Sequence, residues 1–289
     1  MNLQTPALLR LIDSWIDEDI GRGDLSSIAL QENNVSASWI AKSSGIFCGG
    51  FIIETLFKRL DKFTQVNLLI KDGERFISGQ KILILEGSPK SLVAIERTAL
   101  NITMHLSGIA TATYSMVNEL KGTGVRLVDT RKTTPGLRVL EKYATRCGGG
   151  LNHRMGLDDA IMLKENHLAW SKNLESAISK IRGIAPWTAK IIVEAEKAQQ
   201  AIEGVQAGAD GILLDEIPHQ TLKDLVPELR HLAQKRSKRN LPSTIILEAS
   251  GILPAQLKEY ASTGVDLISS SAPITKSSWV DFSMRFEVN

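Results

Sequence analysis

Cysteine is scarce in this chain, with Cys48 and Cys147 the two examples in 289 residues and no CxxC pair. Two isolated cysteines exclude a disulfide framework and favour a reducing, cytoplasmic compartment. No apolar run reaches the 18 residues that suggest a membrane-spanning helix. The first twenty residues carry several acids and no basic segment followed by an apolar one, so we expect no signal peptide.

An excess of charge of one sign is also missing. Lys and Arg total 34 and Asp and Glu total 32, for a formal net charge of +2. Nucleic-acid-binding proteins carry a strong basic field, which this composition lacks, so we expect neither nucleic acid nor a membrane as a partner. The short basic run KRSKR at 235–239 has no interleaved aromatic residue, and we expect it to be a solvated loop.

Several motifs that mark enzyme classes are absent. The chain has neither a G-x-G-x-x-G nor a G-x-x-x-x-G-K-[ST] phosphate loop, which argues against a doubly wound nucleotide-binding sheet. There is no G-x-S-x-G nucleophile elbow, and none of the five histidines has H-x-x-x-H spacing. Serine hydrolysis and a zinc enzyme with such a histidine pair are therefore disfavoured.

The first part of the sequence is predicted to be a small α+β unit. It opens with an amphipathic helix at 6–19, for which Thr5 is a suitable N-cap. A second helix is expected at 51–60. The strand-like segments around it are 35–42, 46–48, 66–71 and 81–86.

A long helix is expected at 88–121, where a serine and a proline supply an N-cap and a first-turn residue. Arg97, Asn101 and His105 recur at intervals of four residues and therefore share one face of this helix. From the residues alone, a polar face turned towards water is the simplest interpretation of these three side chains.

Beyond residue 124, short apolar runs alternate with segments long enough to form a helix. This alternation is typical of parallel strands whose two faces are covered. Since the nucleotide-binding loops of open sheets are absent, we predict an α/β barrel. The six runs are VRLVD (125–129), AIMLK (160–164), KIIVE (190–194), GILLD (211–215), TIILE (244–248) and VDLIS (265–269).

Each of these runs ends on a polar residue. In a parallel barrel the carboxyl ends of the strands lie at one mouth, where active sites occur. Glu194, Asp215 and Glu248 offer carboxylates suited to ribose hydroxyls or to a hard divalent cation. The other three end residues are Asp129, Lys164 and Ser269.

The run 129–167 carries a local excess of positive charge. Between Arg131 and Lys164, seven Lys or Arg accompany three Asp or Glu. Arg131 and Arg154 supply planar forks for a carboxylate or a phosphate, while Lys132 and Lys164 act as point charges. Such a cluster inside a nearly neutral chain indicates a site for a small, multiply negative ligand.

Two features of this run leave alternatives open. His153 could donate to a ligand carboxylate or satisfy a buried carbonyl. The glycines at 148–150 could let backbone N–H groups approach an anion or could form a turn. The reaction class is open as well: Lys132 or Lys164 could form the Schiff base of a sugar-phosphate aldolase, and anion binding without catalysis would also explain the cations.

A resemblance to a known family rests on the segments ERTALN, LSGIAT, DTRKTTPGLR, GGGLNHRMGLDDAIMLKENH, VEAE, GADGILLDE and LEASG. They resemble quinolinate phosphoribosyltransferases, also called carboxylating nicotinate-nucleotide pyrophosphorylases, over nearly the whole chain. The closing string SSSAPITKSSWVDFSM is most similar to the cyanobacterial members.

The resemblance implies two domains: an N-terminal open α/β sandwich at 1–112, joined by 276–289, and an incomplete (β/α) barrel at 113–275. It implies a cytoplasmic homodimer with shared active sites, with further assembly left open. The implied reaction joins quinolinate to phosphoribosyl pyrophosphate (PRPP) in de novo NAD biosynthesis. It yields nicotinate mononucleotide, pyrophosphate and carbon dioxide, with magnesium as the cofactor of PRPP.

The resemblance also implies roles for individual positions. Those matching the residues that hold the quinolinate carboxylates are Arg131, His153, Arg154 and Lys164. Arg97 matches a residue donated by the neighbouring subunit, which replaces the interpretation of a solvated face. The positions matching the catalytic groups on the PRPP side are Lys132, Glu194 and Asp215, the last two also as magnesium ligands. The positions matching the phosphate-binding loops are Ser250, Gly251, Ser269, Ser270 and Ser271.

Three departures from the family pattern concern the same end of the barrel. Ile252 stands where a second glycine often follows LEASG, the closing loop reads SSSAPITKS, and Glu216 replaces the asparagine of LLDN. A molybdenum-transport-associated relative of the same fold also has a closing loop with SAP. The intact strings TRKTTPGLR and NHRMGLDDA favour the phosphoribosyltransferases over that relative.

Overall fold

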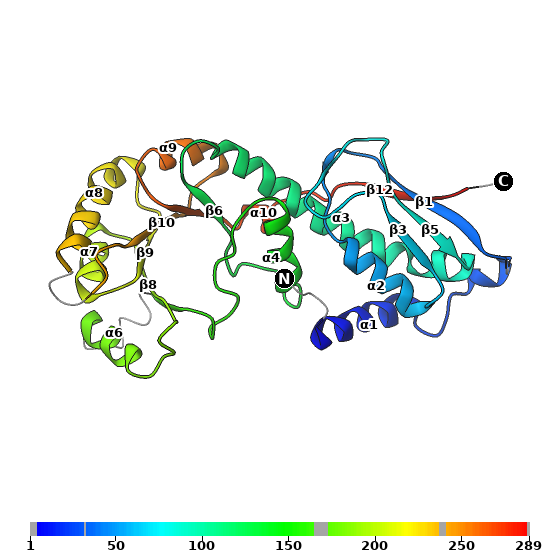
Figure 1. Cartoon of the computed structure of the whole chain (residues 1–289), viewed down its shortest axis with the longest axis horizontal. Coiled ribbons are helices and arrows are strands. Elements are labelled where there is room, and N and C mark those ends of the chain that lie inside the picture. Colours follow the sequence, from blue (N-terminus) through cyan, green and yellow to red (C-terminus); the bar gives the residue numbers. More distant parts are fainter. Residues whose placement is uncertain (1–4, 32, 165–172, 237–240, 288–289) are drawn as a thin grey trace. The chain divides into compact units, whose positions relative to one another are not determined.

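The chain divides into two compact units in a computed structural model that describes residues 5–31, 33–164, 173–236 and 241–287. Unit 1 comprises Met1–Tyr114, Thr134–Gly149 and Lys276–Asn289, and unit 2 comprises Ser115–Thr133 and Gly150–Thr275 (Figure 1). The segment 134–149, which the sequence placed with the barrel, therefore packs within unit 1. The closing part of the run 129–167, from 165 onwards, lies outside the described residues.

Unit 1 is built on an antiparallel sheet in the order β12-β1-β5-β3. Strand β12, from the end of the chain, pairs with β1, so that Trp39 is aligned with Met284. A two-stranded ribbon of β2 and β4 completes the strands, and β4 was not anticipated from the sequence. The strands are β1 (Val35–Ala41), β2 (Gly45–Ile46), β3 (Gln65–Leu68), β4 (Arg75–Phe76), β5 (Lys81–Gly87) and β12 (Phe282–Phe286).

The helices of unit 1 follow from local signals in the sequence. Helix α1 (Pro6–Ile20) begins as predicted, because the Thr5 side chain accepts a hydrogen bond from the backbone N–H of Leu8 at 3.3 Å. Gly108 lies inside α3, where a β-carbon would meet the carbonyl oxygen of Ser278 at 2.4 Å, so glycine permits the returning chain to cross the helix. The other helices are η1 (Ser26–Ala29), α2 (Gly50–Leu60), α4 (Arg138–Cys147) and α3 (Pro89–Glu119), whose residues from Ser115 onwards belong to unit 2.

Unit 2 contains the predicted parallel strands. All six apolar runs form strands of one parallel sheet, in the order β6-β11-β10-β9-β8-β7. Strands β6 and β7 lie at the two ends of this order, so the barrel is incomplete. The strands are β6 (Arg126–Val128), β7 (Ile161–Leu163), β8 (Ile191–Ala195), β9 (Gly211–Asp215), β10 (Ile246–Ser250) and β11 (Leu267–Ser269).

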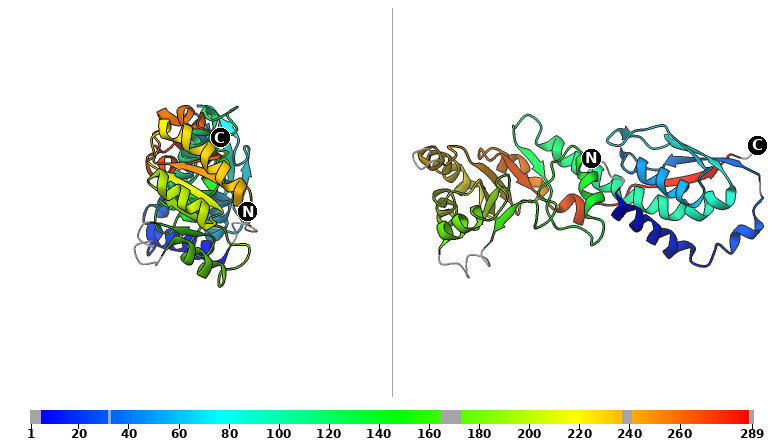
Figure 2. Two further views of the ribbon diagram at one scale, coloured as in Figure 1. Left: turned by 90° about the vertical axis from the view of Figure 1, so that its left-hand side faces the viewer. Right: turned by 60° about the horizontal axis from the view of Figure 1, so that its bottom comes forward.

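Helices cover one face of this sheet. In both views of Figure 2 the helices α6, α7 and α8 lie outside the strands as a layer. Val193, Ile212 and Leu247 are buried in the core of unit 2, so the alternate residues of their strands lie on the other face of the sheet. No helix in the described part of the chain is long and apolar enough to cross a membrane. The helices are α6 (Leu174–Arg182), α7 (Ala198–Ala207), α8 (His219–Lys235), η3 (Pro254–Gln256), α9 (Leu257–Ala261) and α10 (Ala272–Thr275).

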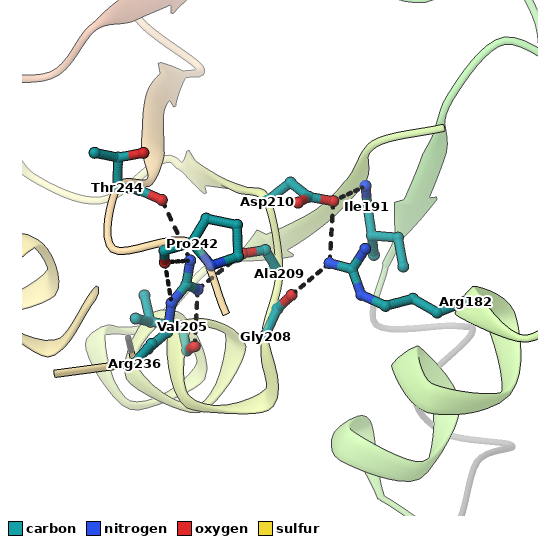
Figure 3. Close-up of polar contacts among 9 residues, drawn as sticks. All are labelled: Arg182, Ile191, Val205, Gly208, Ala209, Asp210, Arg236, Pro242 and Thr244. Atoms are coloured by element: carbon teal, nitrogen blue, oxygen red, sulfur yellow. Dashed lines mark hydrogen bonds and ion pairs between the residues drawn. The ribbon is translucent and has the colours of Figure 1, made fainter. Parts of the chain in front are cut away.

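The basic run at 235–239 is only partly described, and its second residue corrects the prediction of a solvated loop. Arg236 is 4% exposed, and its guanidinium donates to the backbone carbonyls of Val205, Ala209, Pro242 and Thr244 (Figure 3). Burial lowers the pKa of this arginine, but five donors in a planar fork can satisfy several carbonyls at once. Arg236 is therefore a structural residue that ties the end of α8 to two neighbouring loops.

Candidate functional site

The register of the parallel strands gathers polar residues into a row on the face that the helices do not cover. Glu194 of β8 is aligned with Leu213 of β9, which is aligned with Glu248 of β10. The pairing of β7 with β8 continues this row and places Lys164 beside Glu194. Aligned residues of neighbouring parallel strands point to the same face, so one row combines a cation with two carboxylates.

A second row lies two residues further along the strands, nearer their carboxyl ends. Asp215 of β9 is aligned with Ser250 of β10, and the pairing of β10 with β11 continues to Ser269. This row therefore combines a carboxylate with two hydroxyl groups at the end where ligand sites occur in parallel α/β proteins.

Lys164 and Glu194 form an ion pair, in which the ammonium group donates to Oε2 of the carboxylate. The Glu194 side chain is mostly buried, whereas the lysine is 44% exposed. An ion-paired ammonium group suits a lysine that binds an anion rather than one that attacks a carbonyl as a free amine. The pair therefore favours ligand binding over the Schiff-base alternative.

A buried aspartate holds the segment that carries His153. Asp129 is 2% exposed, and its carboxylate accepts hydrogen bonds from the Asn152 side-chain amide and the His153 backbone N–H, both at 2.7 Å. Leu151 forms a parallel bridge with Val128 at the end of β6. These contacts extend the sheet by one short segment, and they place His153 at the edge of the site.

The imidazole of His153 is oriented by two neighbours. Its Nδ1 accepts from the backbone N–H of Arg154 at 2.7 Å, which assigns any proton of a neutral ring to Nε2. Nε2 lies 3.4 Å from Oε2 of Glu248, whose side chain is 5% exposed. Among the described residues, no group hydrogen-bonds to Oε1 of this glutamate. Glu248 is therefore a buried carboxylate with acceptor capacity directed at the site.

The guanidinium of Arg154 interacts electrostatically with that of Arg131 and with the Glu194 carboxylate. The Nη1 of Arg154 donates to the carbonyl of Ala160 at 2.9 Å. The pKa of Arg154 is lowered, chiefly by burial and also by repulsion from Arg131, while Asp159 and Glu194 oppose the shift. Arg154 is half-buried and Arg131 is exposed, and like charges near each other are costly unless an anion neutralises them. The predicted pairing of Arg131 with Arg154 in one anion site is thus consistent with their electrostatic coupling.

The loop after β10 is tightly constrained by the loop after β9. Gly251 has φ of 78°, and a β-carbon there would meet Cγ of Glu216 at 2.7 Å. Glu216 has φ of 54° and is the one described non-glycine residue with a positive φ, and its N–H donates to the carbonyl of Ser250 at 3.2 Å. Left-handed backbone is tolerated best by Gly and Asn, so a glutamate at position 216 carries a cost in stability.

The serines after β11 are largely buried. Ser269 is 3% exposed, and no described residue hydrogen-bonds to its Oγ. The backbone N–H of Ser270 donates to the carbonyl of Val128, and its Oγ accepts from the N–H of Ala272 at 3.2 Å. Ser271 starts the short turn of α10. These contacts fix the loop at the strand ends.

Lys132 lies in the turn that follows β6. Its side chain is exposed, and its backbone N–H donates to Oγ1 of Thr130 at 3.0 Å. Asp215 is half-buried at the end of β9. All predicted site residues after position 130 therefore belong to unit 2, at or just beyond the carboxyl ends of its strands.

Arg97 belongs to unit 1, and it shares a cavity with the other members of its helical face. Arg97, Asn101 and His105 line a cavity of about 260 Å³ together with Trp15 and Trp279. Arg97 itself is exposed, but the cavity shows that this face of α3 is more than a solvated surface.

Helix α4 supplies a carboxylate to the same part of unit 1. Nε2 of His105 lies 2.9 Å from Oε1 of Glu141, whose side chain is fully buried, and Oε2 accepts from the backbone N–H of Thr134 at 2.9 Å. Burial alone would raise the pKa of Glu141, but the hydrogen bonds from His105 and Thr134 outweigh it and lower the pKa. His105 is therefore held by a charged partner that the sequence did not indicate.

The glycines at 148–150 were expected to form either an anion-binding backbone segment or a turn, and the structure favours the turn. Gly148 follows α4 directly, and a β-carbon there would meet the carbonyl of Ala110 at 2.4 Å and Cβ of Thr113 at 2.6 Å. Gly149 has φ of 90°. The first two glycines thus permit close packing and a left-handed turn at the end of the helix.

Sequence reasoning named Glu248 and Asp129 as strand-end residues but did not anticipate what they contact. Glu248 ends the fifth of the six apolar runs, so its position signalled a role, yet no motif distinguished it from a surface acid. Asp129 ends the first run, and its two hydrogen bonds to the 150–154 segment depend on contacts that no spacing rule predicts.

An incomplete parallel α/β barrel with cations, carboxylates and hydroxyls on one face of its strand ends defines an α/β protein with a site for anionic ligands. The family follows from two matches. Residues 24–107 match the N-terminal domain of quinolinate phosphoribosyl transferase, and residues 109–285 match its C-terminal domain. The chain therefore belongs to the quinolinate phosphoribosyl transferase family, which confirms the resemblance.

Relatives and solved structures agree with this membership. The chain is 40% identical to a probable carboxylating nicotinate-nucleotide pyrophosphorylase of Synechocystis, covering 96% of this chain and 92% of the relative. It is 42% identical to its Bacillus subtilis counterpart, over 91% and 87% of the two chains. The nicotinate-nucleotide pyrophosphorylase structure from Francisella tularensis superposes with a TM-score of 0.90 at 31% identity, covering 98% of each chain.

Proposed function

We propose that this chain catalyses the carboxylating nicotinate-nucleotide pyrophosphorylase reaction of NAD biosynthesis. Quinolinate and PRPP give nicotinate mononucleotide, pyrophosphate and carbon dioxide. The observation that carries the proposal is the row of Lys164, Glu194 and Glu248 across three strand ends, with Arg154 coupled to Arg131 beside it. Cations for a dicarboxylate and acids for a cationic ribosyl centre both occur in this site.

The quinolinate side of the site is assigned to four residues. Arg131, Arg154 and Lys164 neutralise the two carboxylates, and His153 donates from Nε2. Two guanidinium groups match two carboxylates well, because each planar fork can bind a carboxylate with two hydrogen bonds. Without such a set of cations, the dicarboxylate and the phosphates of PRPP would repel each other at contact distance.

The PRPP side is assigned to the second row and to the loops beyond it. Lys132 contacts a phosphate, and Glu194 and Asp215 act near the ribose. The phosphate loops are assigned to Ser250, Gly251 and the serines at 269–271. The unpartnered Oγ of Ser269 supports this assignment, because it is a buried donor with no protein acceptor among the described residues.

Magnesium fits the donor set on this side. Glu194 and Asp215 are carboxylates of neighbouring strands, and Mg²⁺ prefers oxygen ligands together with substrate phosphates. These two residues would hold the ion with PRPP, and the ion would supply neutralisation of the pyrophosphate charge.

The chemistry requires positioning and charge compensation rather than a covalent nucleophile. The ring nitrogen forms a bond to the ribosyl carbon as the bond to pyrophosphate breaks, and Glu194 and Asp215 stabilise the electron-poor ribosyl centre. The resulting ring cation then accepts the electron pair left when the adjacent carboxylate departs as carbon dioxide, and a proton replaces that carboxylate. Orientation of the two substrates lowers the barrier by about 7–11 kcal/mol at most.

Arg97 is assigned to the active site of a partner subunit. An arginine exposed at the edge of the cavity in unit 1 is available to a second copy of the chain. The assignment makes the protein a homodimer with shared active sites. Mixing inactive Arg97→Ala and inactive Arg131→Ala chains would then restore part of the activity in mixed dimers. No recovery after verified subunit exchange would refute the sharing.

The direct test is an assay of the purified protein with quinolinate, PRPP and magnesium. We expect nicotinate mononucleotide and carbon dioxide in equal amounts. Arg131→Ala is expected to weaken quinolinate binding by about 2–5 kcal/mol, because it leaves a substrate carboxylate without its partner. Failure to form the mononucleotide in protein shown to be folded would refute the proposed reaction.

A further inference from the structure

The two cysteines of the chain lie in one cluster within unit 1, although they are far apart in sequence. Cys48 lies between β2 and α2, Cys147 is the last residue of α4, and Asp72 lies in the turn between β3 and β4. One ligand atom of each, two Sγ atoms and a carboxylate oxygen, lie within 4.8 Å of one another. Three separate segments of unit 1 therefore converge on two thiols and a carboxylate.

The backbone around the cluster is fixed. Cys48 is fully buried, and Ser107 of α3 accepts from its N–H at 3.0 Å and donates to its carbonyl at 3.2 Å. Oδ1 of Asp72 accepts from the N–H groups of Gly49 and Gly50 at the start of α2, both at 3.0 Å. Oδ2 accepts from the hydroxyl of Tyr143 at 2.7 Å. Hydrogen bonds thus fix the Asp72 carboxylate and the backbone of Cys48 before any ligand arrives.

All the titratable groups of the cluster are potential anions. Burial is the main cause that raises the pKa of the Cys48 thiol, and Cys147 and Asp72 raise it further. Burial and the bond to Asp72 raise the pKa of the Tyr143 hydroxyl, again with contributions from both thiols. Among the described groups that perturb these two residues, none is a cation. The geometry of the cluster, with two thiols and a carboxylate converging on one point, is what indicates a cation.

We propose that Cys48, Cys147 and Asp72 form a binding site for one thiophilic divalent cation such as Zn²⁺, with water in the fourth position. Two sulfurs and one oxygen are a ligand set that selects Zn²⁺ over Mg²⁺, which binds oxygen alone. Two sulfurs bound to one tetrahedral cation at about 2.3 Å lie roughly 3.8 Å apart. This distance is within the 4.8 Å limit on the separations of the three ligand atoms in the structure. Cys147 is half-buried, so the cation and the water would enter from its side.

Binding would join the ends of three elements. On coordination the two thiols release their protons to the buffer, and the cation links the start of α2, the turn at Asp72 and the end of α4. The site lies within unit 1 and uses none of the residues assigned to quinolinate, PRPP or magnesium. Its test is therefore independent of the proposed reaction.

The experiment uses Co²⁺ as the probe on the reduced full-length protein. Thiolate ligands give Co²⁺ an intense sulfur-to-metal absorption band, and the chain has no cysteines other than these two, so the band reports this site alone. We expect one Co²⁺ per chain, displacement of the band by Zn²⁺, and a rise in the unfolding temperature with either metal. Cys147→Ser and Cys48→Ser should weaken or abolish the band, and Cys48→Ala provides a second variant that avoids a buried hydroxyl.

Two variants separate ligands from neighbours. Asp72→Asn retains an oxygen that can accept from the two glycine N–H groups, and it should lower the Co²⁺ affinity while the sulfur band persists. Tyr143→Phe removes a hydrogen bond but no ligand and should leave the band unchanged. A band that persists in Cys48→Ser/Cys147→Ser would overturn the proposal. So would absence of the band in the reduced protein, including the case in which mild oxidation joins the two cysteines in a disulfide.

Discussion

Glu248 provides the sharpest test of how the proposed quinolinate site is organised. Its carboxylate lies 3.4 Å from Nε2 of His153, and the two side chains are 5% and 11% exposed. If Glu248 orients the imidazole, then Glu248→Gln removes the charge, retains the shape and weakens the hold on His153. The residue is then a positioning residue for substrate binding rather than part of the ribosyl transfer.

The expected magnitude follows from the geometry. A distance of 3.4 Å exceeds that of an ordinary hydrogen bond, so the loss should be smaller than the roughly 2–5 kcal/mol seen for buried charged pairs. We expect Glu248→Gln to raise the KM for quinolinate by about tenfold, which corresponds to about 1.4 kcal/mol. Glu248→Ala, which also removes volume, should raise it further. The KM for PRPP and kcat should change much less.

The assay is steady-state kinetics with each substrate varied in turn. Glu259→Gln is the matched control, because Oε1 of Glu259 lies 2.9 Å from Nε2 of His219 in a pair that is far more exposed. A double-mutant cycle with His153→Ala should give a coupling energy of about 1 kcal/mol. Additive effects, or a fall in kcat with an unchanged KM for quinolinate, would refute positioning through His153 and place Glu248 with the groups that act on the ribose.

Three further predictions concern stability, measured as the free energy of unfolding. Arg236→Lys should destabilise unit 2 by about 1–3 kcal/mol, because an ammonium group cannot satisfy the carbonyls that the fork reaches, whereas Arg230→Lys on the surface should cost far less. Glu216→Asn should stabilise the chain by about 1 kcal/mol by relieving left-handed strain, and Glu216→Ala should give no such gain. Glu141→Gln should cost about 1–3 kcal/mol at pH 7. The pKa of Glu141 is lower in the folded protein than in the unfolded chain, so the ionised carboxylate stabilises the fold fully above the unfolded pKa. This stabilisation is lost as the pH falls through the folded pKa, so the difference in free energy of unfolding between wild type and Glu141→Gln should vanish in acid. A difference that stays constant with pH would contradict the assignment.

The parallel strands were predictable from the sequence because each is a short apolar run separated from the next by enough residues for a helix. The start of α1 was likewise predictable, because the N-cap hydrogen bond of Thr5 is local in the sequence. The strand β4 was not predictable, since two residues carry no periodicity. Nor was the burial of Arg236, because a run of basic residues gives no sign of the carbonyls that distant loops bring to one of them. Local signals thus sufficed for the elements, and contacts between remote segments decided the exceptions.

In the candidate site too, local sequence predicted some features and contacts between remote segments decided the others. The cationic run indicated an anion from composition alone, but charge within a segment does not determine which cation meets which acid. Strand register determines these pairings. A shift of β8 or β10 by one residue would point Glu194 or Glu248 into the apolar layer under the helices. The observed alignment instead places both glutamates in the row of Lys164. The pairing of β6 with the segment after the glycines then brings His153 to Glu248. We therefore expect the proposed substrate site to depend on strand register, so that a variant that shifts this register should lose quinolinate binding even with every charged residue intact.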